Sequence, residues 1–137
     1  VVGFRIGLKN STQLVKSTFK LAYEQRQPQF PLLFHTDRGS NYRSNAFCAY
    51  LQSLGVTQSF SRAHIPYDNS VMESFFASMK REELYRTKYR SEQELRAAVA
   101  DYIKFYNETR SHAKNGYKTP FKKEQEYYVN SKQNEKK

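Results

Sequence analysis

Two acidic side chains stand out in an otherwise basic chain, because their positions could bring carboxylates to a common site. Asp37 directly follows PLLFHT, a run that is apolar up to His35, and precedes Gly39 and Ser40. Glu73 lies within YDNSVMESFFASMKREEL. Carboxylates are hard oxygen ligands that hold Mg²⁺ beside phosphates without a full protein cage. Two such ions, roughly 3.5–4 Å apart, can stabilise the attacking and leaving oxygens of a phosphodiester reaction. The pair therefore predicts nuclease-like or strand-transferring chemistry.

Each carboxylate also has a structural interpretation. Asp, Gly, Ser and Asn are the usual turn residues, so a turn explains Asp37 on its own better than a site does. Ser70 and Glu73 have the spacing of a capping box, in which Glu73 would bond to a backbone N–H. On the functional interpretation, Asn69, Glu73 and Lys80 share a narrow arc beside an apolar stripe, at roughly 100° per residue. These stretches alone leave both interpretations open.

Other catalytic chemistries find little support. The three histidines, His35, His64 and His112, are scattered, and Cys48 has no cysteine partner, which argues against a zinc site. No nucleophile elbow and no glycine-rich phosphate loop occurs in the sequence. A single cysteine cannot form an internal disulfide, so a reducing cytoplasm fits, and Cys48 is predicted to be a small buried hydrophobe.

The apolar patterns of the first half predict strands alternating with helices. The expected elements are a strand at residues 2–8, a helix begun by Asn10 and ended by Pro28, a strand at 32–36, a helix begun by Ser44 and ended by Gly55, and a strand at 56–60. This order predicts a mostly parallel sheet between helices, with the strand at 32–36 covered on both faces. Asp37 would then lie at the carboxyl edge, where such sheets bind ligands.

The second half reads as helical. A helix from Asp68 would carry the apolar stripe Met72, Phe75, Phe76 and Met79. A second helix would begin at Ser91, with its capping partner Glu94, and carry the apolar face Leu95, Val99, Tyr102 and Tyr106. After Gly116 and Pro120 the chain is rich in lysine and poor in aliphatic residues, which predicts a loosely ordered basic tail. We expect a core at residues 1–110 and a tail at 111–137.

Composition limits the partners. The chain has 137 residues, room for one domain, with 23 Lys and Arg against 13 Asp and Glu, a net charge of +10. Such a charge predicts a polyanionic partner, nucleic acid before an anionic membrane surface. No apolar run approaches the roughly 20 residues that span a bilayer, which predicts a soluble protein without membrane contacts. Because the chain opens with Val1 on a strand-like alternation, we expect it to be the C-terminal piece of a longer protein.

The motifs around both carboxylates agree with one known family. HTDRGSNY and DNSVMESFFASMKREEL, with residues 38 to 72, 35 in all, between Asp37 and Glu73, resemble the DDE transposases of bacterial insertion sequences. The likeness is closest to their orfB branch, relatives of retroviral integrases. It runs from VVGFRIG through YIKFYNETRSH to the TP near position 120. It implies a ribonuclease-H-like fold, a mixed sheet flanked by helices that lacks its first strand in this chain, with a helical C-terminal part.

The resemblance also assigns roles. Asp37 and Glu73 would be the second and third acidic ligands of a site that uses Mg²⁺ or Mn²⁺. The family reaction releases a 3′-OH at the element end by hydrolysis, and that hydroxyl then attacks a target phosphodiester. Candidate DNA contacts are Arg38, Asn69, Lys80 and Arg110; Tyr106, Asn107, Arg110 and His112 match the family's YN..R.H signature. The active complex is expected to be a homo-oligomer on element-end and target DNA.

The sequence departs from the family pattern in three places. The only acidic residue before Asp37 is Glu24, on a predicted helix, so the first acidic ligand is expected upstream of this chain. Ala63 and His64 stand where relatives often have a basic residue and Gly, and Ser111 stands where Pro is usual.

Two other functions remain open at this point. A non-catalytic nucleic-acid-binding remnant would use the charge together with 11 Tyr and 10 Phe for phosphate contacts and stacking. An acid-metal nuclease would cleave without joining. Divalent-ion binding separates the first alternative from a transposase core, and a DNA-joining assay separates the second.

Overall fold

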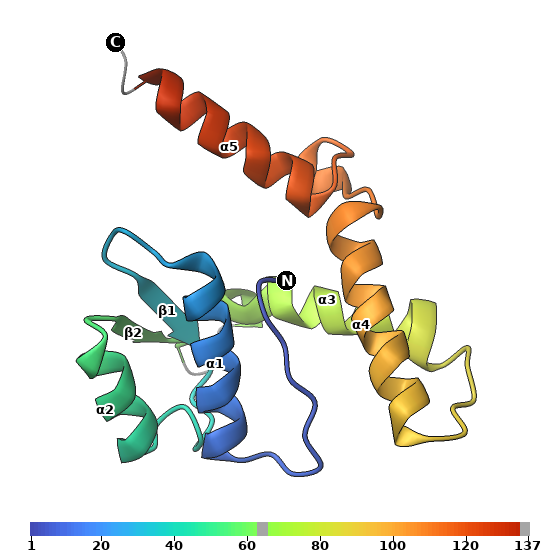
Figure 1. The fold of residues 1–137 in the computed structure, drawn as a ribbon, viewed down its shortest axis with the longest axis horizontal. Helices are drawn as coiled ribbons and strands as arrows, with labels where there is room; N and C mark the ends of the chain where they lie inside the picture. The colour runs from blue at the N-terminus through green and yellow to red at the C-terminus, as the bar shows by residue number, and fades with distance from the viewer. Residues whose placement is uncertain (63–65, 135–137) are drawn as a thin grey trace. The chain divides into compact units, whose positions relative to one another are not determined.

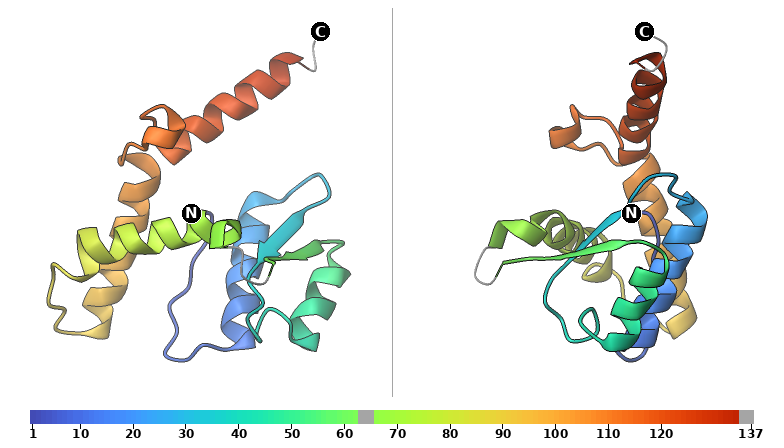
Figure 2. Two further views of the ribbon diagram at one scale, coloured as in Figure 1. Left: turned by 180° about the vertical axis from the view of Figure 1, so that it is seen from behind. Right: turned by 90° about the vertical axis from the view of Figure 1, so that its left-hand side faces the viewer.

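The computed structural model describes residues 1–62 and 66–134, which form two compact units. The first unit is Val2–Ser78, and the second unit is Met79–Lys137 together with Val1. Figures 1 and 2 show the helices and strands of both. The division into a core at residues 1–110 and a tail at 111–137 stays a prediction. The variant positions Ala63 and His64 lie outside the described residues.

The first unit alternates helices and strands, as predicted. Its order is α1 (Thr12–Arg26), β1 (Leu33–Thr36), α2 (Asn45–Ser53) and β2 (Thr57–Phe60). β1 and β2 pair in parallel, in a register that runs from Leu33 opposite Thr57 to Thr36 opposite Phe60. A parallel pair needs a crossover connection, and α2 supplies it (Figure 1). Within the described residues these two strands make up the whole sheet.

The core of the first unit lies between the sheet and its helices. Phe19 of α1, Phe47 and Leu51 of α2, and Val56 before β2 are buried together. Phe34 of β1 packs against them, with its ring edge-on to Phe19 at a centroid distance of 4.7 Å. Aromatic residues bury large apolar areas, so these rings dominate the packing. The inward face of β1 is thereby fixed.

The opposite face of β1 is open, which corrects the prediction of a strand covered on both sides. Leu33 is 62% exposed and His35 is exposed, whereas Phe34 and Thr36 point inward. The continuous apolar run misled the prediction, because such a run is typical of strands with a layer on each face. Here the helices cover one face only, and the residue after the strand, Asp37, is exposed.

Residues 2–8 are not a strand, and that prediction was wrong. No described strand pairs with them, and a strand needs a partner for its backbone N–H and C=O groups. The alternation has another cause. A Cβ on Gly3 would lie 3.0 Å from Ala22 Cβ, and one on Gly7 would lie 3.0 Å from Leu14 Cδ2, both in α1. The two glycines therefore let this segment run close along α1.

Helix caps explain where α1 and α2 begin. The side chain of Ser11, rather than the predicted Asn10, accepts a hydrogen bond from Leu14 N at the start of α1. Asn10 instead accepts from Asn41 Nδ2 at 2.8 Å. Ser44 caps α2 by accepting from Phe47 N, as predicted. Gly55 follows α2 with φ of +67°, which confirms its role as the helix stop.

The last helix of the first unit follows a 3₁₀ turn. That turn is η1 (Pro66–Asn69), and α3 (Ser70–Met79) continues from it. Of the predicted apolar stripe, Phe75 and Met79 are buried, whereas Met72 is 59% and Phe76 is 44% exposed. The stripe is thus only half buried in this chain.

The second unit is helical. It contains the π-helical turn η2 (Lys80–Leu84), α4 (Glu92–Glu108), the 3₁₀ turn η3 (Ala113–Asn115) and α5 (Pro120–Asn134). Ser91 caps α4 by accepting from Glu94 N, as predicted, and the Glu94 carboxylate accepts from Arg90 N at 2.6 Å. Val99, Tyr102 and Ile103 form the buried side of α4. None of the helices in the described ranges is both long and apolar enough to cross a membrane.

α5 replaces the loosely ordered segment expected after Gly116, so that expectation was wrong for residues 120–134. Thr119 Oγ1 accepts a hydrogen bond from Lys122 N at the start of the helix. The ammonium of Lys118 pairs with the carboxylate of Glu126 at 2.6 Å. These local bonds favour a helix despite the shortage of aliphatic residues.

Candidate active site

Asp37 directly follows the last residue of β1, and it is exposed. Oδ1 accepts a hydrogen bond from Gly39 N at 2.8 Å, which is the Asx turn that the structural interpretation foresaw. A Cβ at position 39 would lie 2.9 Å from that oxygen, so a larger residue there would push the Asp37 carboxylate aside. No described residue hydrogen-bonds Oδ2. Asp37 is therefore a turn residue that still offers one carboxylate oxygen to a ligand.

Asp37 influences the pKa of the Tyr42 hydroxyl. Burial raises the pKa of the Tyr42 hydroxyl, and the negative charge of Asp37 raises it further. Tyr42 also packs against Phe47 of the core, with ring centroids 6.0 Å apart. Tyr42, whose pKa responds to Asp37, is thus held in place by the core.

Glu73 lies in the first turn of α3 and is exposed. Its carboxylate makes no hydrogen bond or ion pair with any described residue, so the capping bond suggested by its spacing from Ser70 is not formed within the described residues. A free carboxylate at the start of a helix is favoured by the helix dipole. Glu73 is thus available for a ligand.

Asp37 and Glu73 fit a magnesium ion by the type of their donor atoms. Both supply carboxylate oxygens that are open to solvent, as Mg²⁺ prefers when it keeps several of its waters. Within residues 1–62 and 66–134, no group of three or more His, Cys, Asp or Glu side chains is arranged to hold a metal ion. The predicted number of ligands from this chain is two. A zinc-type cluster is absent from the described residues.

Arg38 and Asn69 are the predicted DNA contacts in the first unit. Arg38 is exposed, and its Nε donates to the backbone oxygen of Ser61 at 3.0 Å. This bond holds the inner part of the guanidinium group and leaves the two Nη groups without a described partner. Asn69 ends η1, one residue before α3, and is partly exposed.

Lys80 and Arg110, the other two predicted contacts, belong to the second unit. Lys80 is the first residue of η2 and is exposed. Arg110 is in a different situation, because its Nη2 lies 2.7 Å from Oε1 of Glu82 and its Nε lies 2.9 Å from Oε2. Tyr102 donates to the same carboxylate at 2.9 Å. Arg110 is therefore held by a two-bond ion pair.

Other residues of the YN..R.H signature lie around the ion pair of Glu82 and Arg110. Arg110 Nη1 lies 3.3 Å from His112 Nδ1, and the His112 ring meets the ring of Tyr106 at a centroid distance of 4.5 Å. The hydrogen bond from Arg110 lowers the pKa of Glu82 to about 2, and burial only partly opposes this effect. Burial, together with the hydrogen bond to Glu82, raises the pKa of Tyr102. Tyr106, Arg110 and His112 of the signature thus form part of a polar network around Glu82 in the second unit.

Sequence analysis missed Glu82 and Ser61. Glu82 is one of several acidic and basic residues in a row, and its partner Arg110 lies 28 positions further on. No periodic pattern in the sequence predicts such a pair. In the structure Glu82 lies in the π-helical turn η2, and π turns occur often at functional sites.

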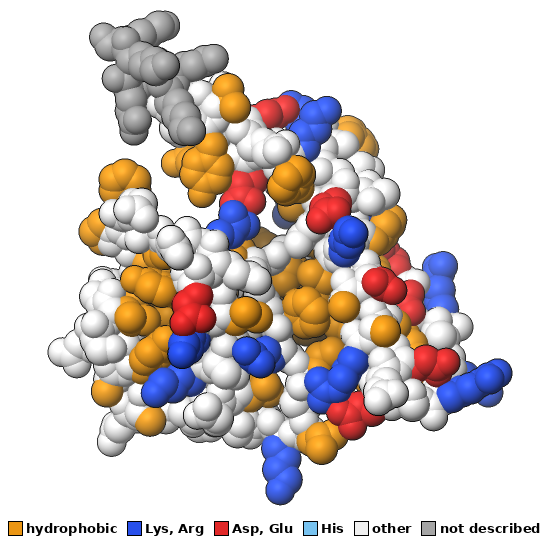
Figure 3. Space-filling model, viewed as in Figure 1, with side chains coloured by type: hydrophobic (Ala, Val, Ile, Leu, Met, Phe, Trp, Pro, Cys, Tyr) orange, Lys and Arg blue, Asp and Glu red, His pale blue; other side chains and the backbone are white. Residues whose placement is uncertain are grey.

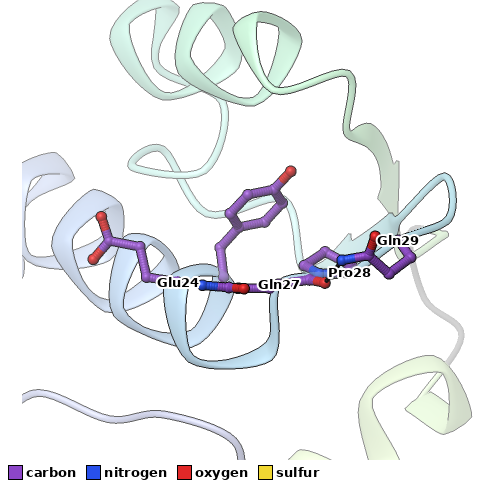
Figure 4. Close-up of a pocket in the computed structure, with 5 residues that line it drawn as sticks. Glu24, Gln27, Pro28 and Gln29 are labelled. Carbon is purple, nitrogen blue, oxygen red and sulfur yellow. Dashed lines mark hydrogen bonds between the residues drawn. The ribbon is translucent and has the colours of Figure 1, made fainter.

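A hollow in the first unit includes Glu24 and not Asp37 among the residues that line it. It has a volume of about 340 Å³ and is lined by Tyr23, Glu24, Gln27, Pro28 and Gln29 at the end of α1 (Figure 4). Glu24 is exposed and lies 3.6 Å from the ammonium of Lys20. Its position on α1 confirms that it does not sit at a strand end.

Basic side chains do not gather in one place on the face shown in Figure 3. Lys and Arg side chains are interspersed there with Asp, Glu and apolar side chains. The basic side chains on that face therefore do not by themselves mark a DNA track.

Comparison with known proteins gives a consistent family. The integrase core domain family matches residues 1–66 and residues 54–120. The transposase for insertion sequence element IS904 of Lactococcus lactis subsp. lactis (strain IL1403) is 35% identical over 121 residues, which are 88% of this chain and 48% of that protein. The transposase InsF for insertion sequence IS3fB of Escherichia coli (strain K12) is 32% identical over 82% of this chain and 40% of its own length. The chain thus spans less than half the length of these relatives.

The fold has a solved counterpart. The crystal structure of the catalytic core domain of BIV integrase matches 97% of this chain and 80% of its own, with a TM-score of 0.60 at 19% identity. The predicted ribonuclease-H-like fold is thereby confirmed. Since the family matches extend over residues 1–120 and the relatives are transposases, the chain belongs to the integrase-core family, among the DDE transposases of bacterial insertion sequences.

Proposed function

We propose that this chain carries part of the catalytic site of a transposase, in which Asp37 and Glu73 bind Mg²⁺ or Mn²⁺ for DNA cleavage and strand transfer. The observation that carries the proposal is the state of these two carboxylates. Both are exposed, one at the end of β1 and one at the start of α3, and both keep oxygens without a described partner. Carboxylate oxygens without a structural partner are available for metal.

Some residues of the chain would hold the metal, and others would contact the DNA. When bound, the metal would activate the attacking hydroxyl and offset the charge that develops on the phosphate. Asp37 would direct its free oxygen toward the ion while Gly39 N holds the other oxygen. Glu73 would supply the second carboxylate from the first turn of α3. A third ligand would have to come from outside the described residues.

Four side chains are proposed to contact the DNA backbone. Arg38, Asn69 and Lys80 have side-chain donors without a described partner. Arg110 would be the weakest of the four, because each nitrogen of its guanidinium group already lies within hydrogen-bonding distance of Glu82 or His112. Phosphate contacts of this kind give affinity without sequence preference. The proposed partners are element-end and target DNA in the bacterial cytoplasm, bound by a homo-oligomer.

The test is a DNA-joining assay with a transposase of full length that carries this core. Asp37→Asn and Glu73→Gln should each abolish cleavage and joining, because the transition-state charge would lose its metal. Glu24→Gln is the matched control and should retain both, since Glu24 is an exposed carboxylate on α1. Normal joining by either site variant would refute the proposal. Cleavage without joining by the unaltered protein would favour a nuclease instead.

A further inference from the structure

Ser61 makes three hydrogen bonds to the residues on either side of Asp37, at the end of β1. It directly follows β2 and is only 8% exposed. Its backbone N–H donates to Thr36 O at 2.8 Å, and its hydroxyl donates to the same oxygen at 3.3 Å. Its own backbone oxygen accepts from Arg38 Nε at 3.0 Å. Ser61 thus bonds to the residue before Asp37 and to the residue after it.

His35 braces this arrangement on the open face of the sheet. Its Nδ1 lies 3.0 Å from Ser59 Oγ, and its Nε2 lies 3.1 Å from Ser61 Oγ. His35 lies two positions before Asp37, and Asp37 directly follows the last residue of β1. The buried Thr36 between them donates its hydroxyl to Asp37 O at 2.9 Å. The peptide that carries Asp37 is therefore bonded on each side.

We infer that the His35–Ser61 pair positions Asp37 for metal binding. The pair would do so by fixing the backbone at Asp37, where the chain leaves the sheet. The inference rests on the proposed function of Asp37. An exposed carboxylate on a loosely held peptide would have to be ordered when the ion binds, and that entropy cost would weaken binding. Ser61 touches no metal in this scheme and acts only through Thr36, Arg38 and His35.

Ser59 provides a matched control on the same strand. The Ser59 hydroxyl also bonds to His35, but within the described residues that hydroxyl makes no hydrogen bond to Thr36 or Arg38. Ser59→Ala and Ser61→Ala each remove one hydroxyl and one bond to the imidazole. Only Ser61→Ala also removes a bond to the end of β1. A purely structural role in joining the strands would affect both variants alike.

The experiment is Mn²⁺ binding by the 137-residue chain, read from the electron paramagnetic resonance signal of free Mn²⁺, with a thermal melt for each variant. Ser61→Ala should weaken binding about tenfold at a thermal midpoint close to that of Ser59→Ala, as expected when a ligand's support is lost. Ser59→Ala should change the affinity by less than about twofold, because Ser61 still holds the strand end. Equal affinities of the two variants would overturn the inference.

Two further variants keep the outcome clear. Asp37→Asn reports on the proposed function, because an unchanged affinity in that variant would mean that Asp37 binds no metal at all. If Ser61→Ala does not fold, His35→Ala decides, since its side chain is exposed and leaves no cavity. His35→Ala should lose several-fold in affinity, and wild-type affinity in this variant would overturn the inference.

Discussion

Glu73 and Glu82 lie nine positions apart and are used in opposite ways. Glu73 is exposed and has no described partner, whereas Glu82 accepts hydrogen bonds from Arg110 and Tyr102 and is 25% exposed in its side chain. A carboxylate with all its bonds made inside the protein stabilises a fold. A carboxylate with none has kept its capacity for a ligand. Glu82 therefore has a structural role, while Glu73 stays a candidate metal ligand.

The largest expected difference is in stability. Glu82→Gln should destabilise the second unit by about 2 kcal/mol, because it removes the ion pair and leaves the half-buried Arg110 charge without its partner. Glu73→Gln should change the free energy of unfolding by less than about 0.5 kcal/mol, as is usual for exposed positions. Urea denaturation followed by circular dichroism measures both. Equal losses would break the comparison.

Acid should reveal the same difference. The pKa of Glu82 in the folded chain is about 2, below its ordinary value of 4.5. A lowered pKa contributes stability that is present above the ordinary value and is lost as the pH falls from there toward the folded value. The wild-type chain should therefore lose more stability between pH 4.5 and pH 2 than Glu82→Gln does. Parallel pH profiles of the two proteins would show that the ion pair contributes little.

DNA binding gives a smaller contrast, between two arginines. Arg38→Gln should lower the slope of log affinity against log salt by about 0.9, the value for one phosphate contact. Arg110→Lys should change this slope less, because Glu82 already binds two of the guanidinium nitrogens, while it lowers the thermal midpoint. Fluorescence anisotropy with labelled duplex DNA at several salt concentrations measures the slopes. A larger slope change for Arg110→Lys would make Arg110 the stronger contact.

Local signals carried most of the sequence-based predictions that held. Ser44, Gly55 and Ser91 set helix ends through bonds to neighbours a few residues away, so their roles can be read from short stretches. The position of Asp37 at a strand end was equally local. The family motifs then linked it to Glu73, a link that neither stretch could make alone.

Non-local contacts account for the rest. Residues 2–8 alternate as a strand would, but the pattern reflects Gly3 and Gly7 lying against α1, and only the fold brings that helix alongside. The ion pair of Glu82 with Arg110 and the bonds of Ser61 to Thr36 join residues more than twenty positions apart. Sequence periodicity carries no information about such pairs.

The most direct test of the account is the affinity of the chain for Mn²⁺ at neutral pH, with single substitutions of its acidic residues. We expect one weakly held ion, largely hydrated, and a loss of at least about tenfold in affinity for both Asp37→Asn and Glu73→Gln. Glu24→Gln should bind like the wild-type chain, because Glu24 lies on α1 beside Lys20. Undiminished binding by Asp37→Asn and Glu73→Gln would contradict the assignment of these carboxylates to metal.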